Sequence, residues 1–373
     1  MRLADAPAWL RDTALRFLPH ATRPGLRRIG NPDRNSPVLV TGNFALTVRR
    51  LRDALHGRDA WLLVANSRGI NVWCAASGGH LTDHEVVAAV RASGIGDQVS
   101  HRRLVLPQLA ATGIERRRIT ESTGWEAVWG PARLEDLPAY FDRGGSVARR
   151  DRWMRFPAWE RLEMAAMWTV PMALVAAIAL ALAAGAATAL AGTGALALTV
   201  AALFLLLPWL RVTGPLRFPT LAGLAAVQLG IAAGALALAA GPPTIAAWIG
   251  LVASAAVSMG LLAVDLAGTT PWYASSVIAH HERPTLELLE DACTGAADCV
   301  LVCPRDVLAM QGKRRKVAIA RPDDCVRCGA CIVQCPSDAL RFRLADGRVV
   351  EPDIIRSTRL NLLGRRAVEV RRG

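Results

Sequence analysis

Between Met164 and Gly268 the chain is almost without charged side chains, and this feature limits what it can fold into more than any other. The only charged residues in the segment are Arg211, Arg217 and Asp265. It divides into four apolar stretches, at about 165–184, 190–210, 219–240 and 245–267. Each has about the length of a helix that crosses a bilayer. Buried helices of a large core are the alternative, and four such stretches in succession disfavour it.

The flanking charges predict how these stretches are oriented. The approach between Arg149 and Arg161 is basic, and so is the link that contains Arg211 and Arg217, whereas the other two links carry no charge. Basic segments stay on the cytoplasmic side of a membrane, and four crossings return the chain to the side that it left. We therefore expect a multi-pass protein of the cytoplasmic (inner) membrane, with the lipid bilayer as a partner and both flanking regions in the cytoplasm.

Composition disfavours a nucleic-acid partner. The formal net charge is +13, and of the 44 basic residues only Lys313 and Lys316 are lysine. These charges are dispersed, and no helix-turn-helix, zinc-finger or base-stacking pattern accompanies them. A basic cytoplasmic surface beside anionic lipids explains them better. Residues 1–35 contain no apolar run long enough for the core of a signal peptide, so we expect the N-terminal leader there not to be a signal peptide.

The region 36–160 has the pattern of an α/β domain. Helical spacing over Phe44–Leu55 and Leu81–Ala92 alternates with short apolar runs, which are Val38–Val40, Trp61–Ala65 and Leu104–Leu106. Such alternation predicts a doubly wound, Rossmann-like and mostly parallel sheet. Sheets of this kind bind ligands at the carboxyl ends of their strands. Cys74 follows one of the predicted strands, and we expect its segment to open a helix there.

The other seven cysteines lie in a C-terminal region, 284–345, which precedes an Arg-rich tail at 346–373. Four of them, followed by Pro336, form the run C-x2-C-x2-C-x3-C-P of bacterial two-cluster ferredoxins: Cys325, Cys328, Cys331 and Cys335. Zinc is the alternative, but its sites usually take well-separated cysteine pairs. The run predicts an α+β, ferredoxin-like domain with two iron–sulfur clusters.

The first cysteine group is incomplete. It has Cys293, Cys299 and Cys303, and Ala296 stands where the second cysteine belongs. In these motifs the fourth cysteine of each run binds the other cluster. Cluster one would then be held by Cys293, Cys299 and Cys335, and cluster two by Cys303, Cys325, Cys328 and Cys331. We expect a [4Fe–4S] cluster two, and a cluster one that is [3Fe–4S], or [4Fe–4S] completed by Asp298 or water.

An isolated cysteine is most often a small buried apolar residue, but the sequence around Cys74 points elsewhere. The run Asn71-Val72-Trp73-Cys74-Ala75-Ala76 resembles the signature of the mercury-methylation corrinoid protein family. Three further blocks resemble that family: Thr41–Val48, His101–Leu109 and Val128–Pro131. The resemblance covers roughly residues 36–160, and the membrane helices that follow match as well. The family's partner protein is a ferredoxin, which is here fused to the same chain.

The resemblance implies a specific chemistry. The family's corrinoid domain is similar to that of the corrinoid iron–sulfur protein of the acetyl-CoA pathway. The family's signature cysteine lies on a helix that caps the lower face of the corrinoid, and it ligates cobalt there. Transferred to this chain, Cys74 becomes the catalytic cobalt ligand of a cobalamin-type cofactor. The expected cofactor contacts are Thr41, Gly42, Asn43, Thr47, Asn71, Val72, Trp73, Ala75 and Ala76. The implied function is corrinoid-dependent methyl transfer, with the ferredoxin returning cobalt to Co(I), a methyl-donor protein as partner, and a soft acceptor such as Hg(II).

Several departures disfavour mercury as the substrate. Ser77-Gly78-Gly79 replaces the family's Gly-Lys-Gly, no cysteine follows Cys335, and four membrane helices stand in place of five. The corrinoid fold is thus better supported than the mercury acceptor. A membrane-bound iron–sulfur electron-transfer protein without methyl-transfer activity is the alternative function.

Overall fold

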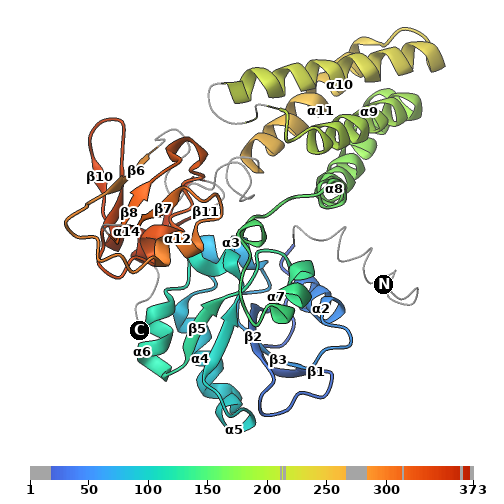
Figure 1. Cartoon of the computed structure of the whole chain (residues 1–373). Coiled ribbons are helices and arrows are strands. Elements are labelled where there is room, and N and C mark those ends of the chain that lie inside the picture. Colours follow the sequence, from blue (N-terminus) through green and yellow to red (C-terminus); the bar gives the residue numbers. More distant parts are fainter. Residues whose placement is uncertain are drawn as a thin grey trace. The chain divides into compact units, whose positions relative to one another are not determined.

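The computed structural model describes residues 18–210, 212, 216–265, 284–312, 315–361 and 364–369 (Figure 1). These residues form two compact units. One unit joins Leu18–Met154 to the described part of Gly268–Gly373, and the other is built from the described part of Arg155–Ala267. The first unit contains the α/β domain together with the cysteine-rich domain, and the second contains the long apolar helices.

A five-stranded sheet is the framework of the α/β domain. Its strand order is β1-β3-β2-β4-β5, with the bounds β1 Gly25–Ile29, β2 Val38–Gly42, β3 Ala60–Ala65, β4 Arg103–Leu106 and β5 Glu126–Trp129. Strands β2 to β5 pair in parallel, and β1 runs antiparallel beside β3 at one edge. The predicted mostly parallel sheet is confirmed.

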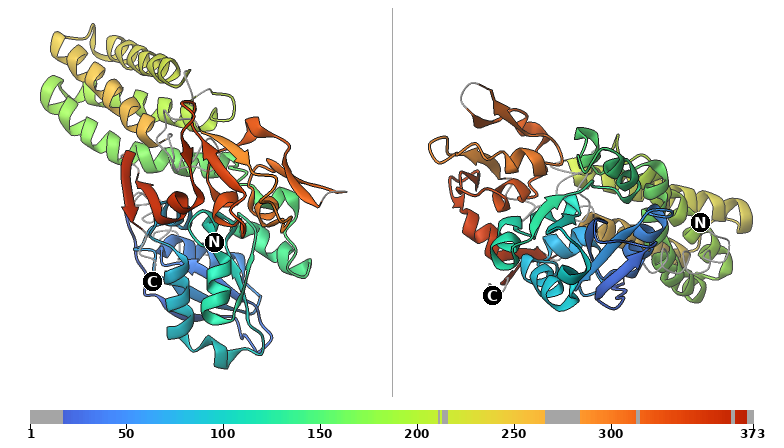
Figure 2. Two further views of the ribbon diagram at one scale, coloured as in Figure 1. Left: turned by 90° about the vertical axis from the view of Figure 1, so that its left-hand side faces the viewer. Right: turned by 60° about the horizontal axis from the view of Figure 1, so that its bottom comes forward.

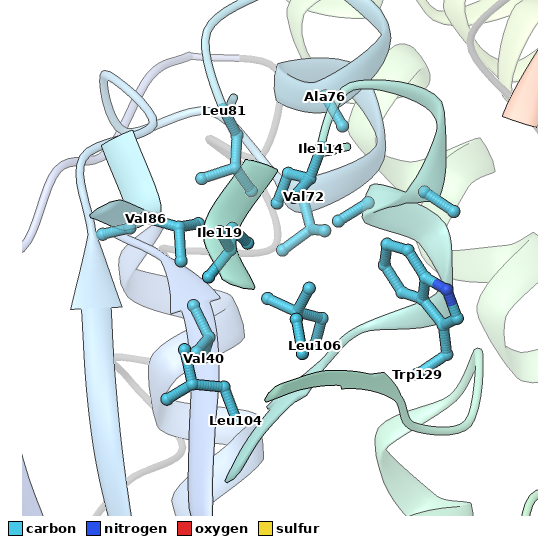
Figure 3. Packing of buried hydrophobic residues seen from close by; sticks show 14 of the residues in the cluster. Val40, Val72, Ala76, Leu81, Val86, Leu104, Leu106, Ile114, Ile119 and Trp129 are labelled. Atoms are coloured by element: carbon cyan, nitrogen blue, oxygen red, sulfur yellow. The ribbon is translucent and has the colours of Figure 1, made fainter. Parts of the chain in front are cut away.

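Helices cover both faces of this sheet (Figure 2). They are α2 Ala45–Ala54, α3 Val72–Ser77, α4 Asp83–Ser93, α5 Ile95–Gln98, α6 Arg116–Thr123 and α7 Leu137–Asp142, with the 3-10 turns η2 Gln108–Thr112, η3 Leu134–Asp136 and η4 Arg149–Arg152. Because side chains alternate along a strand, Val40 packs with Val86 of α4 and Ile119 of α6 on one face (Figure 3). Leu39 packs with Val48 of α2 on the other face.

The strand order reverses at the centre of the sheet. The chain passes from β2 to its neighbour β3 on one side, and later returns to place β4 on the other side of β2. In open parallel sheets, ligands bind beside the carboxyl ends of the strands at such a reversal. Helix α3 follows β3, and η2 follows β4. The segment that carries Cys74 is therefore at the ligand-binding edge of the sheet.

The structure corrects the predicted leader over 1–35. Strand β1 lies within it and pairs along its whole length with β3, from Gly25 opposite Val64 to Ile29 opposite Ala60. Leu26 packs against the main core, and Ile29 is buried. The α/β domain thus begins before residue 36. The prediction that no signal peptide is present falls partly on residues 1–17, which lie outside the described residues.

The cysteine-rich domain combines short strands with short helices. Its sheet has the order β10-β9-β6, with β6 Thr285–Leu288, β9 Leu340–Arg343 and β10 Val349–Val350, and β7 Leu308–Gln311 forms a hairpin with β8 Lys316–Ile319. The helices are α12 Asp298–Val302, the 3-10 turn η6 Pro322–Asp324, α13 Ala330–Val333 and α14 Pro352–Ser357. This arrangement agrees with the predicted α+β, ferredoxin-like fold.

The predicted tail over 346–373 is wrong in its first part. Strand β10 and helix α14 lie there, followed by the paired strands β11 Thr358–Asn361 and β12 Gly364–Glu369. Ile355 is buried in the cysteine-rich core, and Val350 packs against it. Arg356 donates to the backbone carbonyls of Ile332 and Cys335. Val350 and Ile355 stand among many arginines. The composition of the segment therefore does not reveal that it completes the domain.

The second unit consists of four long helices: α8 Ala158–Ala184, α9 Ala186–Leu205, α10 Arg217–Ala240 and α11 Ile245–Asp265. By length and composition, all four can cross a membrane. They pack through small and aliphatic residues, among them Ala189, Ala232 and Leu251. Large apolar side chains such as Leu182 and Leu238 remain exposed on their outer surfaces. This exposure is not what a set of buried core helices would show.

Candidate functional site

Cys74 lies in the short helix α3. Asn71 caps the helix, because its Oδ1 accepts a hydrogen bond from the backbone N–H of Cys74 at 2.9 Å. Val72, Trp73, Ala75 and Ala76 are buried, whereas Cys74 is only half-buried. Helix α3 therefore turns its apolar side chains into the domain and leaves the sulfur of Cys74 within reach of the surface.

The loop before α3 is held by Asn43, at the end of β2. Its Oδ1 accepts hydrogen bonds from Ser67 N, Ser67 Oγ and Gly69 N at 2.8–3.0 Å, and its Nδ2 donates to Thr22 O. Gly42 allows the same loop to approach, since a Cβ atom there would lie 2.6 Å from Ser67 Oγ. Gly42 and Asn43 thus support the loop that leads to Cys74, and the hydrogen-bonding capacity of Asn43 is largely used by the protein itself.

Helix α3 rests against η2, the segment that follows β4. A Cβ atom on Gly113 would lie 2.3 Å from the carbonyl oxygen of Ala76, so the two backbones meet at this point. Ser77 Oγ lies 3.4 Å from Thr112 Oγ1. The two segments form one continuous surface at the carboxyl edge of the sheet. Sequence reasoning missed Ser77, Thr112 and Gly113, because only the fold brings them beside Cys74.

The predicted cofactor contacts divide by exposure. Those that are buried are Thr41, Gly42, Asn43, Val72, Trp73, Ala75 and Ala76, and those that are half-buried are Thr47 and Asn71. Buried polar atoms without a hydrogen-bond partner among the described residues include the Nε1 atoms of Trp73 and Trp129 and Oε1 of Gln108. These three residues lie at the carboxyl ends of β3, β5 and β4. Unsatisfied polar groups in the segments at this end of the sheet fit a partly polar cofactor there.

The cysteine-rich domain brings four of its cysteines around one cavity. Its volume is about 340 Å³, counting its open mouth, and the cysteines that line it are Cys303, Cys325, Cys328 and Cys331. Apolar residues, among them Leu286 and Phe342, complete the wall. Burial is the main cause that raises the pKa of the Cys328 thiol to about 12, and the neighbouring Cys303 and Cys325 contribute to the same shift. These four cysteines are the set expected for cluster two.

A second set of cysteines lies in the same core. Burial raises the pKa of Cys299 to about 12, and the next causes are the neighbouring Cys335 and Cys293. All three are buried, and none of the chain's eight cysteines is in a disulfide. This is the trio expected for cluster one. Within the described residues, no three of the His, Cys, Asp and Glu side chains converge as they would on a single metal ion.

The two cysteine runs have matching backbones 32 residues apart. Gly295 and Ala297 have φ values of +74° and +65°, and their counterparts Arg327 and Gly329 have +56° and +75°. Backbone N–H groups also donate to equivalent sulfurs, from Val307 to Cys303 at 3.2 Å and from Ala339 to Cys335 at 3.3 Å. The first run thus keeps the ligand-loop geometry although it lacks one cysteine.

Ala296 stands at the position of the missing cysteine in the first run, and this residue is exposed. Asp298, the other candidate ligand, forms an ion pair with Arg116 of α6. Burial raises the pKa of Asp298, and Arg116 partly offsets that effect. The carboxylate is therefore engaged at the boundary with the α/β domain, which leaves water as the better remaining candidate.

The cysteine-rich domain is joined to the α/β domain by buried polar contacts. Gln334 of the cysteine-rich domain donates from Nε2 to the carbonyl oxygens of Ala111 and Ile114, and its Oε1 accepts from the backbone N–H of Arg116. Gln108 donates to the carbonyl oxygen of Leu301 at 3.3 Å. One buried apolar cluster also crosses the boundary, because it contains α3 and η2 residues together with Val302, Val326, Cys328 and Ala330.

The segment after the α/β domain makes a second link. Asp306, which is buried, is paired with Arg149 and Arg152 of η4 and with Arg321. Arg152 also donates to the carbonyl oxygen of Val300 at 3.1 Å, and Arg305 lies over the Trp153 ring at 4.8 Å. The basic approach read from the sequence as a membrane-orienting charge therefore also binds the loop that follows Cys303.

Comparison with known proteins finds two matching families. Residues 16–141 match the family described as CO dehydrogenase/acetyl-CoA synthase delta subunit, and residues 292–339 match the family described as 4Fe-4S dicluster domain. Similar curated proteins are acetyl-CoA decarbonylase/synthase complex gamma subunits. That of Methanopyrus kandleri is 38% identical over 129 residues, which are 34% of this chain and 28% of the relative. That of Methanocaldococcus jannaschii is 40% identical over 114 residues, 30% of this chain and 23% of the relative.

These matches support a corrinoid-type domain and a 4Fe–4S dicluster domain in one chain. The family match begins at residue 16, which agrees with the early start of the α/β domain. The chain spans only about a quarter of the length of the curated relatives that it matches. The comparisons support the corrinoid-plus-ferredoxin fusion, and they give no support to the mercury-methylation family in particular.

Proposed function

We propose that this protein is a corrinoid-dependent methyl-transfer protein with its own iron–sulfur electron supply. The observation that carries the proposal is the position of Cys74. It lies half-buried on α3, at the carboxyl edge of a sheet that matches corrinoid proteins of acetyl-CoA chemistry. A domain with seven cysteines packs beside that same edge. A thiol ligand and an electron source are thus joined within one compact unit.

The residues at the edge have separate tasks in this proposal. A bound corrinoid would supply the cobalt centre that accepts a methyl group and passes it on. Cys74 would bind cobalt as a thiolate, a strong anionic donor. Asn71 fixes the backbone of Cys74, while Asn43 and Gly42 hold the preceding loop. The buried predicted contacts therefore act by shaping the platform that presents Cys74.

The iron–sulfur domain would hold two unlike clusters. Cys303, Cys325, Cys328 and Cys331 fit a [4Fe–4S] cluster, since they line one cavity. Cys293, Cys299 and Cys335 would hold cluster one as [3Fe–4S], or as [4Fe–4S] with water at the exposed corner beside Ala296. Such clusters pass single electrons, at potentials that the surrounding protein sets.

The four long helices would anchor the protein in the cytoplasmic membrane. Their length, hydropathy and exposed apolar side chains support this part of the proposal. The basic residues around Arg149–Arg161 would then keep both soluble domains in the cytoplasm. The partner proteins would include a methyl donor, because the relatives are by name subunits of a complex. The methyl acceptor would be a soft group, with Hg(II) as one acceptor to test.

A direct test uses the whole chain in detergent, purified without oxygen and incubated with methylated cobalamin. Binding of cobalt in a 1:1 ratio, followed by loss of the methyl group to Hg(II) or to a thiol acceptor, would support methyl transfer. If the protein holds iron and exchanges electrons but retains no corrinoid, the alternative holds, namely a membrane-bound iron–sulfur electron-transfer protein.

A further inference from the structure

We infer that Gln334 is a positioning residue, which docks the iron–sulfur domain on the η2 segment so that the cluster-two cysteines face the site of Cys74. Electrons would then leave the iron–sulfur domain from the Cys328 side rather than from the trio of cluster one. This inference rests on the proposed function. It adds the surface on which the iron–sulfur domain docks, the side from which electrons would leave that domain, and the residue that fixes both.

Gln334 is built into the α/β domain although it belongs to the iron–sulfur domain. It follows α13 and precedes Cys335. Both of its Nε2 hydrogens are used, toward Ala111 O at 2.9 Å and Ile114 O at 2.6 Å, and its Oε1 accepts from Arg116 N at 3.3 Å. The side chain is buried. A buried amide whose donors are both satisfied across a boundary fixes the register of the two surfaces.

The residues that hydrogen-bond to Gln334 are connected to the helix of Cys74 through a backbone contact. They bracket Gly113, whose backbone meets that of Ala76 in α3. A displacement of η2 would therefore displace the helix that carries Cys74. Two contacts near Gln334 hold the same surface: Arg116 pairs with Asp298, and Gln108 donates to Leu301 O.

One cysteine of the iron–sulfur domain lies in the core that this domain shares with the α/β domain. This cysteine indicates the side from which electrons would leave the iron–sulfur domain. The seven C-terminal cysteines are all among the described residues, and of these only Cys328 belongs to the buried cluster that includes Val72 and Trp73. Val326 and Ala330, on either side of Cys328, belong to it too. The trio Cys293, Cys299 and Cys335 lies in the separate core of the iron–sulfur domain. The ligand loop of cluster two therefore shares one buried core with α3, whereas the trio of cluster one does not.

The electron balance is simple. Each electron that leaves the cluster held by Cys303, Cys325, Cys328 and Cys331 would reduce the bound corrinoid by one electron, and a low-potential one-electron donor would replace it in the iron–sulfur domain. No proton transfer or bond change is required at the boundary between the two domains. The task of Gln334 is positional, since its amide neither binds iron nor titrates.

The test compares Gln334→Ala with Gln311→Ala in the full chain. Gln311 is exposed at the end of β7 in the same domain. The control therefore makes the same chemical change away from the boundary between the two domains. Amide hydrogen exchange without corrinoid reports on docking. Loss of the bonds from Gln334 should speed exchange at Ile114 and Arg116 by about tenfold. The electron paramagnetic resonance of the clusters and their reduction by dithionite should remain unchanged.

The second measurement follows electron passage to bound cobalamin by stopped-flow absorbance. We expect Gln334→Ala to slow this step by roughly tenfold while cluster reduction keeps its rate. If Gln334 merely stabilised the clusters, its replacement would change both the rate of cluster reduction and the rate of electron passage to cobalamin. Gln334→Glu, which keeps the length of the side chain but sets a carboxylate against two carbonyl oxygens, should slow the step as well. It covers the case in which the alanine variant does not fold.

The outcomes separate the two proposals. If wild type reduces cobalamin and both Gln334 variants do so equally fast, the positioning role is wrong and the proposed function stands. If wild type binds no corrinoid, the proposed function and the electron route both fall. In that case unchanged exchange at Arg116 in Gln334→Ala would also refute the docking role.

Discussion

Gly113 and Ala76 meet so closely that a methyl group on Gly113 would lie 2.3 Å from the carbonyl oxygen of Ala76. This contact links the segment after β4, which touches the iron–sulfur domain, to the helix of Cys74. Gly113 has φ −124°, so the glycine is required by the close approach and not by a left-handed backbone. Within the α/β domain, the η2 segment that the iron–sulfur domain contacts is therefore coupled to the helix of Cys74 through backbone atoms.

Replacing Gly113 by alanine should displace α3. We expect Gly113→Ala to lower the free energy of unfolding by about 1–3 kcal/mol, as overpacking of a filled site usually does. Thermal unfolding followed by circular dichroism would measure the loss. Gly96→Ala is the matched control, because its Cβ would meet only ordinary contacts with Arg102 at 3.6 Å. Equal melting temperatures for the two variants would contradict this role of Gly113.

The ion cluster at Asp306 predicts a second effect on stability. Asp306→Asn removes the charge that Arg149, Arg152 and Arg321 share, and it keeps a residue type that tolerates the φ of +50°. Because the carboxylate is buried, the variant should lose roughly 1–3 kcal/mol of stability.

The control for Asp306 is the exposed pair of Asp346 with Arg348. An exposed ion pair contributes little to stability because water screens it, so Asp346→Asn should be nearly neutral. Denaturation of both variants in parallel measures the difference. A neutral Asp306→Asn would show that the three arginines do not hold the loop after Cys303.

Restoring the missing cysteine should complete cluster one. Ala296→Cys places a thiol where the matching run has Cys328, on a backbone that already has the ligand-loop geometry. If cluster one is [3Fe–4S], the variant should gain one iron per chain, and the paramagnetism of the oxidised protein should disappear. Iron analysis and electron paramagnetic resonance measure both changes.

Thr294→Cys is the control for this experiment, because it adds an exposed thiol in the same loop at a position that is not a ligand. It should leave the iron content and the spectrum as in wild type. A wild-type protein that already shows only cubane-type signals would refute the [3Fe–4S] assignment.

Much of the fold can be predicted because its elements have strong local signals. Strands β2 and β3 are continuous apolar runs, as expected of strands buried on both faces. The long helices are recognisable from hydropathy alone, although α8 begins earlier than predicted, at Ala158, and α9 ends at Leu205. Strand β1 gives no such signal, because Gly25-Leu26-Arg27-Arg28-Ile29 is an edge strand with charged, partly exposed residues.

The site was less predictable than the fold. Cysteine spacing suffices to divide the ligands into two sets, since ligation geometry restricts it. Gln334 and Arg116 carry no such pattern, and a glutamine beside a cysteine reads as a polar surface residue. Their roles depend on contacts between segments about 220 residues apart. The burial of Asn43 and Trp73 likewise follows from packing between distant segments, which the sequence pattern does not reveal.

The most direct test of the central claim is the visible spectrum of the anaerobically reconstituted protein with cobalamin, compared between wild type and Cys74→Ala. Cys74 is half-buried, so its replacement should leave the fold intact, and melting temperature and iron content check this. The account predicts that both proteins fold and that only wild type shows a thiolate–cobalt band. Identical spectra, or no corrinoid bound by wild type, would contradict the claim that Cys74 is the cobalt ligand.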